Sequence, residues 1–314
     1  MKVIHVMTKN VNSNFDFTMG NTTKLVAFLS VLKWKSFGYT TKIYVDEYFK
    51  EYFDKIGLLD LYDEVDDTYF TENDLYAQYK IDKYYFWAFS KLFVYLNETE
   101  PFILSDMDFI PLQDFHSIIK EDENYVYYNE ILQNNKSIYP DKESLPTAGR
   151  YAFPKWLTWS CLPVNTAIVY LSDKSLIDLY ITESIRYAKN NKEKYTIEDD
   201  TLRTNEVIPR MVFSEQRLLP ECANYLNIKL NKIKSNYELV FNPREIHLFI
   251  YKNVDSNDNK PYNWLLFFFD KLNQEFPETY AKLINLEEFS EIKEKIDSEG
   301  FVYETPKMLK RTNW

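Results

Sequence analysis

The first 47 residues predict two strands joined by a helix. The apolar runs "KVIHVMT" (2–8) and "TKIYVDE" (41–47) are typical of buried strands. Between them, leucine and phenylalanine recur at helical spacing over 21–38. Two strands joined by a helix pair in parallel through a right-handed crossover. The chain therefore begins as an α/β fold built on a parallel sheet.

The same alternation continues along the chain. We expect helices over 47–62, 84–96 and 173–191 and from Ser214 onward, and strands over 101–108, 164–171 and 245–253. Residues from about 120 to 160 are rich in turn formers and are expected to be irregular, and a loop of that length in a compact domain is usually functional or disordered.

The predicted fold class is a Rossmann-like α/β fold with a mostly parallel central sheet flanked by helices. This domain is expected to span residues 1–252. The segment 263–286 has the pattern of helices, so residues 253–314 are expected to form a C-terminal helical extension packed on the domain.

Composition argues against several classes of protein. The formal net charge of -11 disfavours a nucleic-acid-binding protein, whose surface should be basic. Cys161 and Cys222 are the only cysteines, so neither a disulfide framework nor a zinc cluster is expected, and a cytoplasmic location fits. The chain contains no apolar run of the length that a transmembrane helix needs. The basic segment 307–314 is expected to be solvated, with weak peripheral membrane contact as the alternative.

Two aspartates follow directly on a buried strand. The segment "FILSDMDFIP" (102–111) places Asp106 and Asp108 on either side of one methionine. Ionised carboxylates are costly to bury without a cation, and residues two apart in a strand point the same way. Oxygen ligands of this kind suit Mg²⁺ or Mn²⁺, and open α/β sheets bind ligands at the carboxyl ends of their strands. The pair predicts a divalent-cation site that also binds substrate phosphates; an exposed turn with solvated carboxylates is the alternative.

Four segments, in this order, resemble the metal-dependent glycosyltransferases of the GT-A fold. In the first, "WAFSKLFVYLNETEPFILSDMDFIP" (87–111), a Ser-Lys helix precedes the Asp-x-Asp strand. The others are "VNTAIVYL" (164–171), "SEQRLL" (214–219) and "IHLFIYK" (246–252). The resemblance covers roughly residues 1–252. It departs from the family at Ala167, where many relatives have glycine.

This resemblance implies a set of site residues. Asp108 would be a direct metal ligand, Asp106 would bind the metal through water or contact ribose, and His247 would complete the shell of Mn²⁺ or Mg²⁺. Glu215 would act as a general base, contact the acceptor or support the sugar, so Glu215 and Asp108 are the expected catalytic residues. The residues expected to bind the nucleotide sugar are Thr8, Lys9, Asp46, Lys91, Asp106, Asn165 and Lys252.

Other polar and aromatic residues are weaker candidates for catalysis or sugar binding. His5 and His116 have no companion motif and are expected to be structural, and Asp199 and Asp200 are a weaker alternative to Glu215. Packing is the first expectation for most aromatic residues. Three in the long loop could instead stack on sugars: Tyr151, Trp156 and Trp159.

The sequence therefore predicts an enzyme that moves a sugar from a nucleotide sugar, with UDP-sugars favoured, to a glycan or other hydroxyl acceptor. One alternative is a nucleotidyltransferase acting on a sugar phosphate. Against it, the segment 9–21 has a single glycine where such enzymes usually have a Gly-rich phosphate loop. The other alternative is an inactive glycan-binding relative, which the retained Asp106–Asp108 pair disfavours. The donor sugar, the acceptor, the stereochemistry and the oligomeric state stay open.

Overall fold

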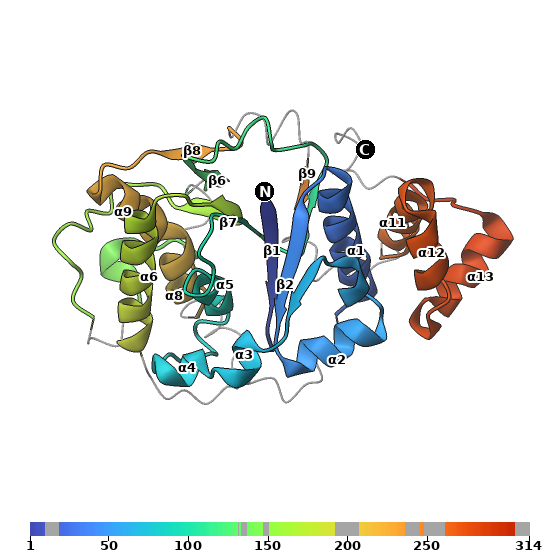
Figure 1. Ribbon diagram of the computed structural model, residues 1–314, viewed down its shortest axis with the longest axis horizontal. Helices are drawn as coiled ribbons and strands as arrows, with labels where there is room; N and C mark the ends of the chain where they lie inside the picture. Colours follow the sequence, from blue (N-terminus) through green and yellow to red (C-terminus); the bar gives the residue numbers. More distant parts are fainter. Residues whose placement is uncertain are drawn as a thin grey trace.

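The computed structural model is an α/β structure built around a seven-stranded sheet (Figure 1). It describes residues 1–9, 19–130, 132, 137–146, 151–191, 207–235, 245–247 and 261–304, with the backbone alone at 245–247 and 261–262. The strand order is β3-β2-β1-β4-β7-β6-β8. The predicted fold class, a mostly parallel sheet flanked by helices, is confirmed.

One strand of the central sheet runs against the other six. The strands are β1 (Lys2–Met7), β2 (Thr40–Val45), β3 (Glu64–Asp66), β4 (Ile103–Ser105), β6 (Asn124–Asn129), β7 (Val164–Tyr170) and β8 (Leu230–Lys232). β7 is antiparallel to both of its neighbours, β4 and β6, and all the other pairings are parallel. The first residues of β7 therefore lie at the edge where β4 and β6 end. Beyond β4, β5 (Phe109–Pro111) pairs with β9 (Glu245–His247) in a separate two-stranded sheet.

The helices begin and end where local chemistry favours it. Asp46 and Asp173 accept hydrogen bonds from the backbone at the starts of α2 and α6, and Gly38 takes a positive φ of 83° after α1. The described helices are α1 (Asn21–Ser36), α2 (Glu47–Lys55), α3 (Tyr69–Glu72), α4 (Leu75–Gln78), α5 (Phe89–Val94), α6 (Lys174–Lys189), α8 (Ile208–Val212), α9 (Leu218–Tyr225), α11 (Pro261–Glu275), α12 (Pro277–Leu283) and α13 (Ser290–Glu299).

Two helical layers bury the two faces of the sheet. α5, α6 and α9 cover one face, and α1 covers the other (Figure 1). The C-terminal helices α11 to α13 pack on the outer side of α1, where Leu266 and Phe268 are buried in the same cluster as Leu25. Two ion pairs of 2.8 Å, Lys24–Glu288 and Lys33–Glu275, also join α1 to this C-terminal segment. The C-terminal helices thus share a hydrophobic core with the first helix of the chain.

The expectation of irregular structure from about residue 120 is wrong at its start, because β6 lies there between β7 and β8. The side chains of Tyr125, Val126 and Tyr127 are all buried, on the two faces of the sheet. No alternation of apolar and polar residues marks such a strand. Its content of tyrosine and valine, which favour strands, was the available signal.

The helix expected over 84–96 is shorter than predicted. α5 covers only Phe89–Val94, and Leu96, the last residue of the expected helix, is 45% exposed. Its buried face, formed by Phe89, Leu92 and Phe93, agrees with the sequence pattern. Lys91 of α5 still reaches the edge of the sheet where the two aspartates lie, because its ammonium pairs with Asp106.

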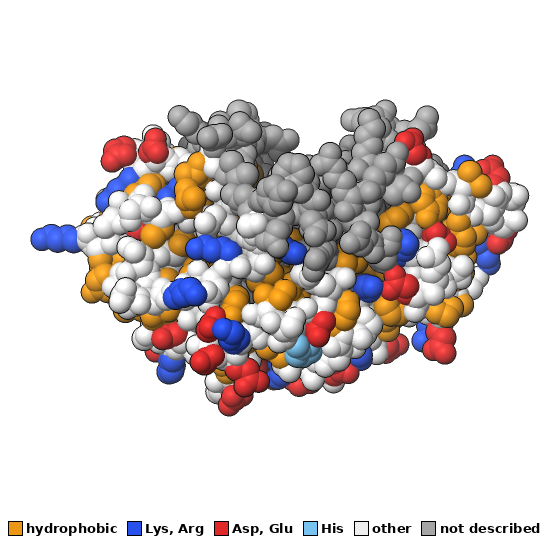
Figure 2. Space-filling view, turned by 90° about the horizontal axis from the view of Figure 1, so that it is seen from above, with side chains coloured by type: hydrophobic (Ala, Val, Ile, Leu, Met, Phe, Trp, Pro, Cys, Tyr) orange, Lys and Arg blue, Asp and Glu red, His pale blue; other side chains and the backbone are white. Residues whose placement is uncertain are grey.

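The charged side chains, the cysteines and the apolarity of the helices can be compared with the expectations from composition. Figure 2 shows acidic and basic side chains interspersed on the face that is seen from above. Both cysteines are free thiols; Cys222 is buried and Cys161 half-buried. Within the described residues, none of the helices combines the length and the apolarity that a membrane span requires.

His5, expected to be structural, lies in the core beneath the sheet edge. Its Nδ1 atom is 2.7 Å from the Tyr62 hydroxyl, and its Nε2 atom is 3.4 Å from the Ser30 hydroxyl. Because Ser30 donates its own proton to the Phe109 carbonyl at 2.6 Å, the ring is best satisfied as a neutral group that donates from Nε2 and accepts at Nδ1. Burial lowers the pKa of His5 to about 4, although the charges of Asp106 and Asp108 oppose this shift.

This burial predicts acid sensitivity. The unfolded chain binds a proton at His5 below about pH 6.5 and the folded chain only below about pH 4, so the free energy of unfolding should fall as the pH is lowered between these values. The loss should reach about 3 kcal/mol at most. Urea titrations at pH 7 and pH 4.5 should show a larger difference for the parent than for His5→Gln. Equal differences would contradict a neutral, buried His5.

Candidate active site

Three parallel strands end together at one edge of the sheet. Met7 at the end of β1 pairs with Val45 at the end of β2, and Ile4 pairs with Leu104 of β4. Four candidate residues therefore follow strand ends at this edge: Thr8, Lys9, Asp46 and Asp106. The predicted placement of these residues at the carboxyl ends of the strands agrees with the structure.

Asp46 joins two of these strand ends. Its Oδ2 atom accepts a hydrogen bond from the Lys9 backbone at 2.6 Å, and its Oδ1 atom accepts one from Phe49 at the start of α2. The Lys9 ammonium lies 4.1 Å from the centroid of the Tyr48 ring. Thr8 is half-buried beside this contact. The structure thus brings Lys9 and Asp46 together and fixes the Asp46 carboxylate through backbone donors.

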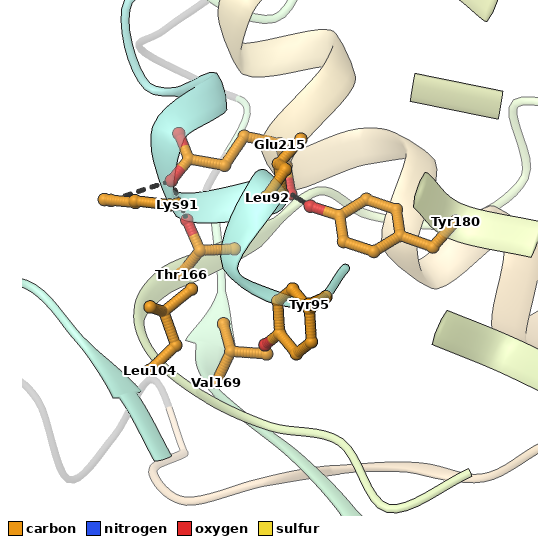
Figure 3. Close-up of a pocket in the computed structure, with 8 residues that line it drawn as sticks. All are labelled: Lys91, Leu92, Tyr95, Leu104, Thr166, Val169, Tyr180 and Glu215. Carbon is orange, nitrogen blue, oxygen red and sulfur yellow. Dashed lines mark hydrogen bonds and ion pairs between the residues drawn. The ribbon is translucent and has the colours of Figure 1, made fainter. Parts of the chain in front are cut away.

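Lys91 lies between two carboxylates from distant parts of the chain. Its ammonium forms an ion pair with Asp106 Oδ1 and a second with Glu215 Oε1 at 2.8 Å, and its side chain is 20% exposed. Figure 3 shows the contact with Glu215. Burial lowers the pKa of Lys91, but the charges of Asp106 and Glu215 together outweigh it and hold the pKa well above its usual range. The group therefore stays cationic at neutral pH.

Glu215 is held by two side chains and by its backbone. Its Oε1 atom also accepts a hydrogen bond from the Thr166 hydroxyl of β7 at 3.0 Å, and its carbonyl accepts one from Tyr180 at 2.7 Å (Figure 3). Leu92 of α5 and Tyr95, which follows this helix, line the same small pocket. The Glu215 carboxylate thus faces inward, toward Lys91, and is fixed there.

The helix around Glu215 differs from the prediction. The prediction of a helix that begins at Ser214 is wrong. Helical structure already begins at α8 and continues through the π-helical turn Phe213–Arg217 into α9. Ser214 donates instead to the Arg210 carbonyl at 3.1 Å. Glu215 is therefore inside a helix, where no favourable interaction with a helix terminus explains its presence. π-Helical turns often occur at functional sites.

The two aspartates lie in the turn between β4 and β5. The Asp106 backbone donates to the Ala167 carbonyl of β7 at 2.9 Å, and the Phe109 backbone donates to the Asp106 carbonyl at 3.1 Å. Asp108 is 6% exposed. The predicted strand, 101–108, contains both residues, whereas β4 ends at Ser105, one residue before Asp106.

The donor set at this turn fits a hard divalent cation. The pairing of β5 with β9 places the His247 backbone opposite Phe109, the residue that follows Asp108. Two carboxylates with one imidazole suit Mn²⁺ or Mg²⁺ better than a soft metal. Among the side chains that the structure describes, which exclude that of His247, no group of three or more His, Cys, Asp or Glu residues is close enough to hold a metal. A complete site would need His247 or substrate oxygens.

Asn165 lies at the start of β7, the strand between β4 and β6. Its amide nitrogen donates to the Tyr128 hydroxyl at 3.2 Å and to Glu130 Oε1 at 2.9 Å, and its amide oxygen accepts from the Ala167 backbone at 3.0 Å. Asn165 is thereby buried and oriented, and its direct neighbour is a carboxylate that the sequence did not single out.

The three aromatic residues that were candidates for sugar stacking differ in exposure. Tyr151 is buried, and its hydroxyl bonds to Glu183, so it packs rather than binds. Trp159 stacks on Phe213, with ring centroids 5.3 Å apart, and Trp156 stacks on Tyr225 at 5.1 Å. His116 pairs with Asp114, as a structural residue would. Lys252, Asp199, Asp200 and the basic segment 307–314 lie outside the described residues.

Sequence reasoning missed several polar residues at this edge. Thr166 and Tyr180 hold Glu215, and Tyr139 donates its hydroxyl to the side chain of Gln216. Glu130 directly follows β6, so recognition of that strand would have identified it as a strand-end carboxylate like Asp106. The tyrosines carried no signal, because 26 of them are spread along the chain.

Comparisons with known proteins give structural likenesses of low identity. No family model matches the chain, and no curated protein is similar to it in sequence. Among solved structures, the chain is similar to the PaToxG glycosyltransferase, with 12% identity, a TM-score of 0.35, and coverage of 94% of this chain and 86% of that chain. It is also similar to mouse xyloside xylosyltransferase 1 in its apo form, with 8% identity, a TM-score of 0.40, and coverage of 74% and 86%. At TM-scores this low, these likenesses assign no role to any residue of this chain.

Proposed function

We propose that this protein is a metal-dependent glycosyltransferase that moves a sugar from a nucleotide sugar to a hydroxyl of a glycan or similar acceptor. A UDP-sugar is the first donor to test. The observation that carries the proposal is the ion pair of Lys91 with Asp106, beside Asp108, at the edge where β1, β2 and β4 end. Carboxylates and a cationic lysine at one strand edge suit a substrate that carries a diphosphate.

The residues divide between the nucleoside and the diphosphate of the donor. Thr8, Lys9 and Asp46, at the ends of β1 and β2, lie where the nucleoside would bind. Lys91 supplies a fixed positive charge for a phosphate oxygen, as a lysine does in many phosphate sites. Lys252, outside the described residues, is proposed as a second phosphate contact.

Asp106, Asp108 and His247 would hold the cation, Mn²⁺ or Mg²⁺. A divalent cation bound by them would offset the negative charge that develops on the leaving diphosphate. The carboxylates also repel a diphosphate when no cation is bound, so they make donor binding dependent on the metal. Lys91 would also offset the negative charge of the leaving diphosphate, because it stays charged between Asp106 and Glu215.

The geometry favours a supporting role for Glu215. A general base must reach the acceptor hydroxyl, yet the Oε1 atom of Glu215 is held by Lys91 and Thr166. A carboxylate held in this way fixes the Lys91 ammonium against the donor phosphates. Glu215 is therefore proposed to act on the donor side, through Lys91.

We expect the binding of UDP to depend on a divalent cation. Calorimetry with Mn²⁺ should give a dissociation constant at least roughly 10-fold lower than the same titration in EDTA, because the two aspartates repel the diphosphate without a cation. Equal affinity for UDP with and without metal would contradict the metal site.

A thermal-shift panel of nucleotide sugars with Mn²⁺ should identify the donor, because a ligand of the folded state raises its apparent stability.

The products distinguish the proposal from its alternative. A glycosyltransferase should release UDP from the donor in the presence of Mn²⁺, slowly to water and faster to an acceptor. A nucleotidyltransferase should instead form sugar phosphate from the nucleotide sugar only when pyrophosphate is added. A protein that binds the donor but forms neither product would support an inactive glycan-binding protein.

A further inference from the structure

A second carboxylate lies at the same edge of the sheet as the aspartate pair. Glu130 follows β6, and its backbone donates to the Pro163 carbonyl at 2.8 Å, just before β7 begins. The Asp106 backbone donates to the Ala167 carbonyl on the other side of β7. The two carboxylates thus flank the start of one strand.

The distance between these positions suits a substrate placed between them. Pro163 and Ala167 are four residues apart, which corresponds to about 13 Å along an extended strand. That separation is too large for Glu130 to bind the cation held by Asp106. It is comparable with the length of a diphosphate joined to a sugar, so a donor whose diphosphate bound at Asp106 would extend its sugar toward Glu130 and leave that carboxylate on the acceptor side.

The groups around Glu130 are those that recognise hydroxyls. Asn165 donates its amide to Glu130 Oε1 at 2.9 Å and to the Tyr128 hydroxyl at 3.2 Å. Burial and the negative charge of Glu130 raise the pKa of Tyr139. Glu130 and Tyr128 are both half-buried, so each is oriented by its neighbours and still reached by solvent.

This cluster is connected to the donor side. The Tyr139 hydroxyl donates to the side chain of Gln216, which directly follows Glu215 in the π-helical turn. Glu215 in turn holds Lys91 and Asp106. Ion pairs thus link Asp106 to Glu215 through Lys91, and a hydrogen bond links the next residue of the π-helical turn, Gln216, to Tyr139.

We propose that Glu130, with Tyr128 and Asn165, forms the acceptor subsite and binds a hydroxyl of a sugar or another polyol. This inference rests on the proposed glycosyltransferase function. The carboxylate accepts hydrogen bonds from one or two adjacent hydroxyls, the tyrosine hydroxyl supplies a matching donor, and the Asn165 amide orients both groups. Such a site selects acceptors with neighbouring hydroxyl groups and leaves donor binding to Lys91 and the aspartates.

The test separates acceptor binding from donor cleavage. UDP release is measured with Mn²⁺ and the donor found in the thermal-shift panel, first without acceptor and then with a panel of methyl glycosides of common monosaccharides. Glu130→Gln should raise the KM of the best acceptor about 10-fold or more, the scale of a lost hydrogen bond to a charged group. UDP release to water should stay within about twofold of the parent, because the donor side is unchanged.

Two further variants control this test. Glu123 lies before β6, at its opposite end, and accepts from Tyr125 and Asn231 in a similar environment, so Glu123→Gln should leave both rates unchanged. Glu130→Asp keeps the charge and should retain a lower KM than Glu130→Gln. Unchanged UDP affinity in each variant shows that the fold is intact.

The possible failures can be told apart. A parent that cleaves no donor overturns the proposed function and this subsite with it. A parent that cleaves donor but is accelerated by no member of the panel overturns the subsite alone. The same holds if Glu130→Gln keeps the parent KM, or if it lowers hydrolysis and transfer equally.

Discussion

Asp108→Asn should lower the rate of sugar transfer by roughly 10³-fold or more while leaving the fold intact. The substitution preserves the shape of the side chain and removes its charge, so the turn between β4 and β5 should be retained. A divalent cation contributes several kcal/mol to stabilising the charge of a transition state, and about 4 kcal/mol corresponds to 10³-fold in rate. Because Asp108 is 6% exposed, water should not be able to take the place of its carboxylate as a ligand of the cation.

Asp173→Asn is the matched control for this prediction. Asp173 caps α6 by accepting from the Leu176 backbone, and asparagine is also a good N-cap. It follows the end of β7, so it lies at the opposite edge of the sheet from Asp108. Donor turnover, UDP affinity with Mn²⁺ and melting temperature should be measured for both variants. Turnover of Asp108→Asn within tenfold of the parent would remove Asp108 from the metal site.

The fold class and the strand-end residues were predictable because both follow from local patterns. The alternation of apolar runs with helical spacing predicts β1, α1, β2 and β4, and parallel pairing then brings their carboxyl ends together. Asp46, Asp106 and Asp108 are found at that edge from the strand pattern alone. Lys91 was found from the helical pattern that precedes this strand in the sequence, although residues 95–102 separate α5 from β4.

The rest depends on contacts between distant segments. Thr166 and Lys91 meet at Glu215 although 49 and 124 residues separate them from it, and no sequence spacing encodes such contacts. Glu130 was missed because β6 is buried on both faces and shows no alternation. Ser214 has the residue type of an N-cap but lies in the interior of a helix, because α8 precedes it with Pro209 in its first turn.

Lys91→Met should both lower stability and reduce transfer. The substitution keeps an unbranched side chain but removes the one described cation that pairs with Asp106 and with Glu215. Removing one partner of a buried ion pair typically costs 3–5 kcal/mol, and since Lys91 is 20% exposed we expect about 3 kcal/mol in the free energy of unfolding. Transfer should fall roughly 10²- to 10³-fold, the scale of one lost electrostatic contact to developing charge.

The second half of this prediction concerns Glu215 and its proposed supporting role. Glu215→Gln alone should lower stability less than Lys91→Met does, because the amide oxygen can still accept from Lys91 and Thr166 and Lys91 keeps Asp106. The double variant Lys91→Met/Glu215→Gln should then be more stable than Lys91→Met, because it no longer buries the unpaired Glu215 charge. Urea titration of the parent, the two single variants and the double variant gives the coupling energy between the two side chains. Thr41→Ser is the control for general effects of substitution in the sheet, because it is a conservative change at a buried hydroxyl remote from the pair. If the two single effects on stability simply add, Lys91 and Glu215 have no coupling energy, and the proposed support of Lys91 by Glu215 is contradicted.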